Sequence, residues 1–124
     1  MVSYDRWPAS AKFKEPIVYA GRWTGNSTAN CNAVTNTGRD LTLIRSGVGV
    51  HTLAFASGAI VPVVEGSNIS LQSPNTNGHQ LQVTPYVSGT GWVITATHAN
   101  GVAVDLASTE EVQAIIWVAY TAVP

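Results

Sequence analysis

The chain has 124 residues, with six Lys and Arg against seven Asp and Glu, a formal net charge of -1 and 45% hydrophobic residues. This length fits a single domain, which can bury roughly two thirds of its unfolded surface in one core. A charge near zero without a basic cluster removes the electrostatic attraction behind most non-specific nucleic-acid binding, so no nucleic-acid partner is expected. No apolar run approaches the ~20 residues of a membrane-spanning helix, and residues 1–16 lack the apolar core of a secretory signal, so neither a membrane partner nor export is expected.

Residues 1–33 differ in composition from the rest and are predicted to form an extended N-terminal arm. They contain four of the six basic residues and two of the four tryptophans, and Pro8 and Pro16 disfavour helical geometry in the residues before them. Aromatic and cationic side chains dominate interaction hot spots, so the arm is a candidate docking segment. The candidate docking residues are Tyr4, Arg6, Trp7, Lys12, Phe13 and Lys14. The alternative is that the arm folds back as the first strand of its own domain.

From residue 34 onward, apolar side chains recur at every second position, which is the periodicity of β-strands. Strands are expected at 41–45, 48–55, 59–65, 68–72, 80–87, 91–98, 102–106 and 111–123. Asn100 with Gly101 is the strongest hairpin signal, and Pro62 indicates an edge position or a bulge for its strand. No segment supports a long helix, so residues 34–124 are predicted as one all-β domain, a β-sandwich or small barrel of about seven or eight antiparallel strands.

The last expected strand, residues 111–123, is unusual because both of its faces are apolar. Ile116 and Val118 lie on one face and three further apolar residues on the other, whereas a sandwich strand with one wet face alternates apolar and polar residues. We expect the second face to be covered by the arm, by another subunit, or by long loops of its own domain. Only 10% of the residues are charged, whereas a surface designed to stay monomeric carries about 25 to 35%. The candidate residues of a subunit interface are Ile115, Trp117 and Ala119.

The residue types that bind metals or act as nucleophiles are sparse and scattered. The histidines at 51, 79 and 98 are not spaced as ligands on one short element, so no metal site is predicted. Cys31 is the single cysteine, which excludes an intrachain disulfide and leaves no Cys-x-x-Cys pattern. We therefore expect Cys31 to be a small buried or half-buried thiol.

The carboxylates do not suggest a pair for general acid–base catalysis. Glu110 and Glu111 are adjacent at the start of the last expected strand, where ordinary solvation is expected. Asp105 lies within an apolar segment and is expected to face outward or to bond to the backbone. The Gly-Val-Gly sequence at 47–49 lacks the lysine and the helix of a phosphate-binding loop. Neither enzymatic activity nor a cofactor is expected.

Residues 45–55 read Arg-Ser-Gly-Val-Gly-Val-His-Thr-Leu-Ala-Phe and resemble the R-x-G-x-G-x-[YH]-x-[VL]-x-F pattern of small jelly-roll domains in structural proteins of tailed bacteriophages. The segments 86–88, 91–94 and 104–106, together with the last strand, are similar to the rest of that layout, so the resemblance covers about residues 34–123. It implies a jelly-roll-like virion surface protein, either a head decoration (cement) protein or the tip domain of a tail fibre. Both are commonly trimeric, and the short chain without stalk sequence favours decoration.

The resemblance thus implies a non-enzymatic homotrimer that is made in the host cytoplasm and resides on the capsid surface of the virion. Its partner would be the major capsid protein of the same particle, which it would bind on the outside of the assembled head and stabilise. That the arm does the docking is our own inference from its residues. The alternative is a carbohydrate- or host-receptor-binding module of a tail fibre, in which Trp92, His79 and the 75–77 loop contact a glycan.

Overall fold

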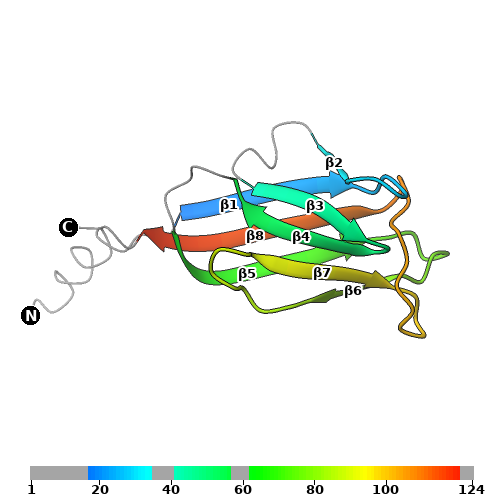
Figure 1. The fold of residues 1–124 in the computed structure, drawn as a ribbon. Helices are drawn as coiled ribbons and strands as arrows, with labels where there is room; N and C mark the ends of the chain where they lie inside the picture. The colour runs from blue at the N-terminus through cyan, green and yellow to red at the C-terminus, as the bar shows by residue number, and fades with distance from the viewer. Residues whose placement is uncertain (1–16, 35–40, 57–61, 121–124) are drawn as a thin grey trace, which may run out of the picture.

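The computed structural model describes residues 17–34, 41–56 and 62–120, which form a sandwich of two four-stranded antiparallel sheets (Figure 1). The strands are β1 (Ile17–Thr24), β2 (Asn32–Ala33), β3 (Leu41–Gly47), β4 (Val50–Phe55), β5 (Pro62–Gln72), β6 (Gln80–Val83), β7 (Trp92–Thr97) and β8 (Glu111–Tyr120). Sheet A has the order β2-β1-β8-β5, and sheet B has the order β3-β4-β7-β6. The prediction of an all-β sandwich with seven or eight antiparallel strands is confirmed. Among the described residues, no helix is long and apolar enough to cross a membrane.

Strand β1 lies inside sheet A, although the sequence assigned its residues to the arm. It pairs with β8 over its whole length, from Ile17 opposite Val118 to Thr24 opposite Glu111. Its periodicity was hidden because the outward-facing positions 18 and 20 are apolar and the inward-facing position 21 is a glycine. The boundary at residue 33 is corrected accordingly: residues 17–33 belong to the sandwich, as in the alternative that the arm supplies the first strand of its own domain.

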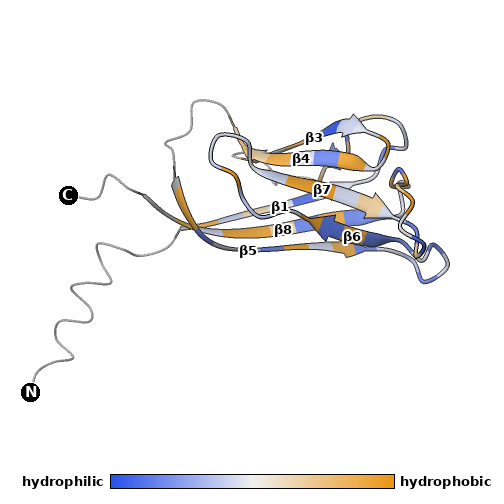
Figure 2. Cartoon of the chain, turned by 60° about the horizontal axis from the view of Figure 1, so that its bottom comes forward, coloured by the Kyte–Doolittle hydropathy of each residue, from blue (hydrophilic) through white to orange (hydrophobic). Residues whose placement is uncertain are grey.

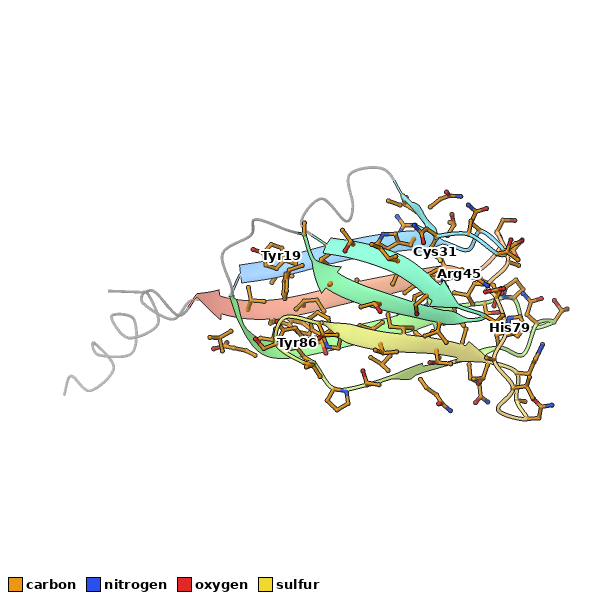
Figure 3. All side chains as sticks on the ribbon, in the orientation of Figure 1. Tyr19, Cys31, Arg45, His79 and Tyr86 are labelled. Carbon is orange, nitrogen blue, oxygen red and sulfur yellow. The ribbon has the colours of Figure 1, made fainter. Side chains whose placement is uncertain are left out.

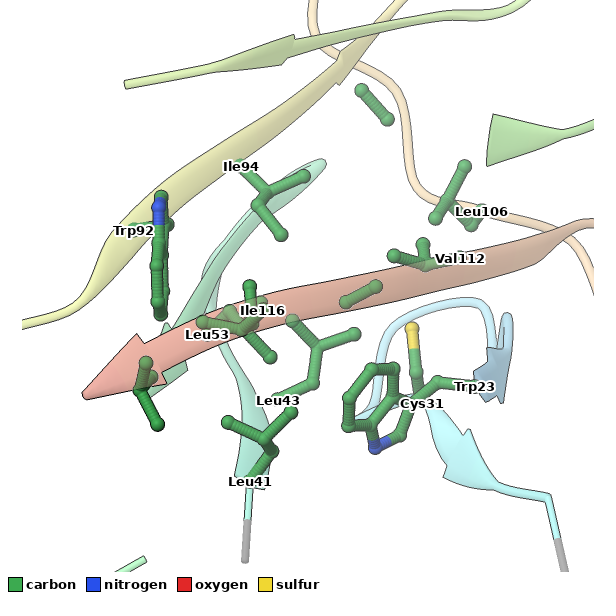
Figure 4. Packing of buried hydrophobic residues seen from close by; sticks show 13 residues of the cluster. Trp23, Cys31, Leu41, Leu43, Leu53, Trp92, Ile94, Leu106, Val112 and Ile116 are labelled. Atoms are coloured by element: carbon green, nitrogen blue, oxygen red, sulfur yellow. The ribbon is translucent and has the colours of Figure 1, made fainter. Parts of the chain in front are cut away.

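The core lies between the two sheets, and the described residues contribute to it the 13 buried side chains shown in Figure 4. Every second residue of β8, from Val112 to Val118, is at most 1% exposed and contacts sheet B side chains such as Leu53 and Ile94. Burial of each valine or isoleucine among them stabilises the fold by about 1.5 to 3 kcal/mol. The resulting alternation appears as bands of orange and blue along the strands in Figure 2. Gly21 also faces inward, where a Cβ would collide with the indole ring of Trp23.

Two expected strands are joined and one is missing. The segments expected at 59–65 and 68–72 are one edge strand, β5, which starts at Pro62 and has a bulge between Val64 and Gly66. The edge position and the bulge are those that the proline indicated. The strand expected at 102–106 is reduced to an isolated bridge between Thr97 and Ala103, because the chain leaves the sheet there and buries Leu106 in the core.

The sandwich has two different ends (Figure 1). Strand β1 begins and strand β8 finishes at one end, which also carries the β6–β7 connection. The loops 25–31, 73–79 and 98–110 and the β3–β4 turn gather at the opposite end, which we call the loop end.

Candidate functional site

The outer face of sheet A carries an exposed apolar patch that spans β1, β8 and β5. Strand β8 lies between the other two, and its outward residues Ile115 and Trp117 are 40% and 37% exposed. The register puts Val18 beside Trp117, and on the other side of β8 it puts Val63 of β5 beside Ala119, two residues further along β8. Val18 and Val63 are 53% and 43% exposed. We call Val18, Val63, Ile115 and Trp117 the outer patch; large apolar groups gathered in this way mark an interaction surface.

The prediction of a doubly apolar last strand is therefore explained by its central position. One face of β8 lies in the core, and the other lies in the outer patch. Within the described ranges no loop of the domain buries Ile115 or Trp117, so the third option, a cover made of the domain's own loops, is not found there. Ala119, the remaining candidate interface residue, pairs with Val63 in the same register.

The part of this sheet face nearer the loop end is polar. Arg22 donates two hydrogen bonds to the Glu111 carboxylate, with distances of 2.6 and 3.2 Å, and the Gln113 amide donates a third at 3.0 Å. The bonds from Arg22 hold the pKa of Glu111 below its ordinary value. The outer face of sheet A thus combines an apolar patch with an adjoining set of paired polar groups.

The glycine motif in β3 and β4 has a structural role at the loop end. The Arg45 guanidinium donates to both carboxylate oxygens of Asp105, at 2.9 and 3.0 Å, and the Gly49 amide donates to the same carboxylate at 2.9 Å. The bonds from Arg45 lower the pKa of Asp105. Asp105 is bonded to the backbone, as expected, but its ion pair with Arg45 was not foreseen, because sixty positions separate the two residues in sequence.

Phe55 is the last residue of the same motif and lies at the other end of β4. Its ring centroid lies 5.4 Å from Tyr19, 6.2 Å from Tyr86 and 5.8 Å from Trp92. These residues come from β1, the β6–β7 connection and β7, so the terminal phenylalanine of the motif joins three segments of the domain.

Cys31 and His51 form a buried pair at the boundary of the core. The thiol sulfur lies 3.4 Å from His51 Nε2, and the two residues are 8% and 2% exposed. Burial raises the pKa of the Cys31 thiol and lowers the pKa of the His51 imidazole. Both groups are therefore held neutral at pH 7, whereas a nucleophilic cysteine requires a stabilised thiolate. The expectation of a buried thiol is confirmed.

Glu110 is fully buried, and the expectation that it is solvated is wrong. Its carboxylate accepts hydrogen bonds from Ser73 Oγ at 2.7 Å, from the Ala107 amide at 2.9 Å and from His79 Nδ1 at 2.7 Å. Burial raises the pKa of Glu110, but these hydrogen bonds outweigh burial and hold it below its ordinary value. The Gly25 amide also donates a hydrogen bond to the Glu110 carbonyl at 3.0 Å. Glu110 therefore links the three loops of the loop end, 25–31, 73–79 and 98–110.

The residues predicted to contact a glycan do not form one site. Trp92 is 1% exposed in the core and packs at a tilt against Tyr86, with centroids 4.7 Å apart. His79 is bonded to Glu110 at the loop end, whereas Tyr86 lies at the opposite end of the sandwich (Figure 3). Trp92 therefore cannot form a sugar-stacking surface together with His79 and the 75–77 loop.

The six candidate docking residues of the arm, from Tyr4 to Lys14, lie outside the described residues. In the part of the chain that is described, no group of three or more His, Cys, Asp or Glu residues is placed to hold a metal ion. No protein-family model matches this chain, and no curated protein or solved structure matches it. The resemblance to bacteriophage virion domains therefore depends on the motif at 45–55 and the segments that follow it.

Proposed function

We propose that this chain is a non-enzymatic structural protein of a virus particle, a decoration protein that binds the outside of an assembled phage head as a homotrimer. The observation that carries the proposal is the outer patch. Ile115 and Trp117 lie at the centre of sheet A, and β1 and β5 add exposed valines on both sides. An interface core of this kind is depleted in charge, and the Arg22–Glu111 pair supplies the polar rim that such interfaces have.

The state of the polar side chains supports binding rather than catalysis. The Cys31–His51 pair is buried and neutral, and Asp105 is engaged by Arg45 and a backbone amide. Glu110 is buried under three hydrogen bonds. Each of these potentially catalytic side chains instead holds two or more segments of the fold together.

The two ends of the sandwich support attachment through the N-terminal segment. Strand β1 begins at Ile17, so any arm that precedes it starts at the end opposite the loop end. In a trimer built through sheet A, the three arms would start from the same end of the assembly. Three linked contacts bind far more tightly than one because the second and third are intramolecular. A protein that binds the assembled shell and not its free subunits then stabilises the shell by mass action.

The subunit contact is tested by comparing two exposed isoleucines, one on each sheet. Ile115 lies in the outer patch, whereas Ile44 is 52% exposed on β3 of sheet B. Light scattering on the purified chain at micromolar concentration should give a trimer. Ile115→Arg should give a monomer, because an unpaired charge in an interface core is costly, and Ile44→Arg should remain trimeric. A wild-type monomer, or equal effects of the two variants, would contradict the interface.

The attachment is tested by co-sedimentation of the purified protein with assembled capsids and, separately, with unassembled capsid protein. We expect the protein to pellet with the assembled shell alone and to raise the temperature at which the shell dissociates. Binding to the free subunits with the same affinity, or to neither form, would refute the decoration role.

A further inference from the structure

A groove opens along one side of the sandwich, between the edge strand β5 of sheet A and the end of β6 with the residues that follow it. It is shallow and open to solvent, with a volume of about 640 Å³. The walls are residues 67–69 of β5 on one side and, on the other, residue 83 at the end of β6 with residues 84–85 after it, and Tyr86 and Trp92 lie between the sheets. We call this the side groove.

Aromatic rings border the side groove from both sheets. Tyr86 is half-buried and packs against Trp92 and Phe55, so its ring is held in place. Trp117 comes from sheet A, and its Cε3 lies 3.5 Å from where a Cβ at Gly66 would be. The indole thus lies over the glycine at the β5 bulge and keeps 37% of its surface exposed. Flat, partly exposed rings that are held by packing bind apolar faces of ligands at low entropic cost.

The polar groups of the groove are uncharged hydroxyls and an amide. Ser67 and Asn68 are exposed on β5, and in the described part of the chain neither side chain has a hydrogen-bond partner. The Thr84 hydroxyl on the opposite wall accepts a bond from the Val93 amide at 2.9 Å, which fixes its position. Asn68 alone offers two donors and one acceptor to a ligand.

The groove also lacks charge. Among the described residues that line it, none is Asp, Glu, Lys, Arg or His. A phosphate, a carboxylate or an ammonium group would lose its hydration there without gaining a charged partner, which is costly. The ligand should therefore be neutral, carry many hydroxyl groups and present an apolar face to the rings.

We propose that the side groove binds a neutral oligosaccharide. The C–H face of a sugar ring packs on Tyr86, and its hydroxyls exchange hydrogen bonds with Asn68, Ser67 and Thr84. This site is distinct from the capsid-binding arm and gives the protein a second partner. Trp117 borders both the side groove and the outer patch. In a trimer the subunit contact takes its exposed face, so the saccharide is held by Tyr86 and the polar groups and lies beside that contact.

The test titrates the purified full-length protein with maltohexaose, cellohexaose and chitohexaose, and with a heparin hexasaccharide as the acidic comparison. Calorimetry and tryptophan fluorescence should detect one saccharide per chain for at least one neutral hexaose and none for heparin. Ser67→Arg places a long side chain in the groove and should weaken binding by about tenfold or more, the equivalent of 1.4 kcal/mol. Gln72→Arg adds the same side chain at an exposed position of β5 outside the groove and should leave binding unchanged.

Several results would overturn the proposal: no binding of any neutral hexaose at millimolar concentration, equal binding of heparin, or equal affinities of the Ser67→Arg and Gln72→Arg variants. Light scattering on both variants should still give the wild-type assembly, because neither position belongs to the outer patch. An Asn68→Ala variant that binds a hexaose as tightly as wild type would also refute the site. If the trimer stays intact but no saccharide binds, the side-groove proposal fails and the decoration role stands. If a saccharide binds but the purified chain is a monomer, the trimeric decoration role fails and the side-groove proposal stands.

Discussion

At the scale of single residues, Gly49 and Glu110 each fix a part of the loop end. Gly49 has a φ of 68°, and its amide binds Asp105. A Cβ at this position would lie 2.6 Å from the carbonyl oxygen of Val104 and 2.8 Å from that of Ala96. The motif glycine is thus required by close backbone contact and by its dihedral angle together.

Gly49→Ala should destabilise the domain more than Gly78→Ala, because the two glycines share a positive φ and differ in their surroundings. Gly78 has a φ of 63°, with open space where a Cβ would lie. We expect a loss of about 1 kcal/mol for Gly78→Ala from the left-handed conformation alone. Gly49→Ala should lose about 3 kcal/mol or more, since backbone atoms must also move. Chemical denaturation measures both, and equal losses would show that the contact with Val104 and Ala96 is unimportant.

Glu110 should make the stability of the domain dependent on acidic pH. Its pKa is lower in the folded chain than in the unfolded chain, so its contribution is complete above the unfolded value and is lost as the pH falls through the folded value. Glu110→Gln should cost about 2 to 4 kcal/mol at pH 7, because charge-assisted bonds are lost in a fully buried site. The variant should also lose less stability than wild type between pH 5 and pH 3.

Glu111→Gln is the matched control for this titration. Glu111 is the neighbouring carboxylate, and its partner Arg22 has a side chain that is 52% exposed. Solvent screens such a pair, so the variant should lose much less stability at pH 7 than Glu110→Gln. If denaturation gave the same loss for both variants, the buried network around Glu110 would not be the cause.

At the scale of elements, the sequence predicts what repeats locally and misses what depends on distant partners. Strands β3, β4, β7 and β8 follow from their period of two, whereas the central place of β8 depends on its pairing with β1 and β5, which the sequence did not predict. Strand β1 was missed because Gly21 interrupts its inward face. The burial of Glu110 was missed because Ser73 and His79 come from another connection. No local sequence pattern indicates which loops will cover the residue before a strand, as they cover Glu110 before β8.

The place of β1 between β2 and β8 predicts the outcome of two N-terminal truncations. Deletion of residues 1–24 removes the whole strand and the buried Trp23, and it leaves one edge of β8 unpaired. This chain should not fold, as measured by loss of the near-ultraviolet tryptophan signal and of a cooperative denaturation transition. Deletion of residues 1–15 keeps β1 from Ile17 and should retain both signals. A cooperative transition in the shorter chain would mean that sheet A forms without β1.

At the scale of the whole molecule, the sandwich has three candidate surfaces, of which the outer patch and the side groove share Trp117. The outer patch lies on the face of sheet A, the side groove lies between β5 and β6, and the loop end is opposite the start of β1. Contacts between copies through sheet A leave the outer face of sheet B and the loop end free. A trimer that attaches at the end where β1 begins would therefore present its loop ends away from the shell.

This arrangement predicts that attachment and assembly can be separated by changes in the arm. Deletion of residues 1–15 should leave a trimer by light scattering, because the outer patch is intact, while co-sedimentation with assembled capsids falls sharply. Trp7→Ala should weaken capsid binding roughly thirtyfold, the equivalent of 2 kcal/mol expected for a hot-spot tryptophan. Replacement of Lys12 and Lys14 by Ala should mainly reduce the salt-sensitive part of binding, since exposed cations act over about a Debye length. If the deletion variant sediments with capsids to the same extent as the full chain, the docking surface lies on the sandwich and not on the arm. The loop end and the outer face of sheet B are the surfaces that the trimer leaves uncovered.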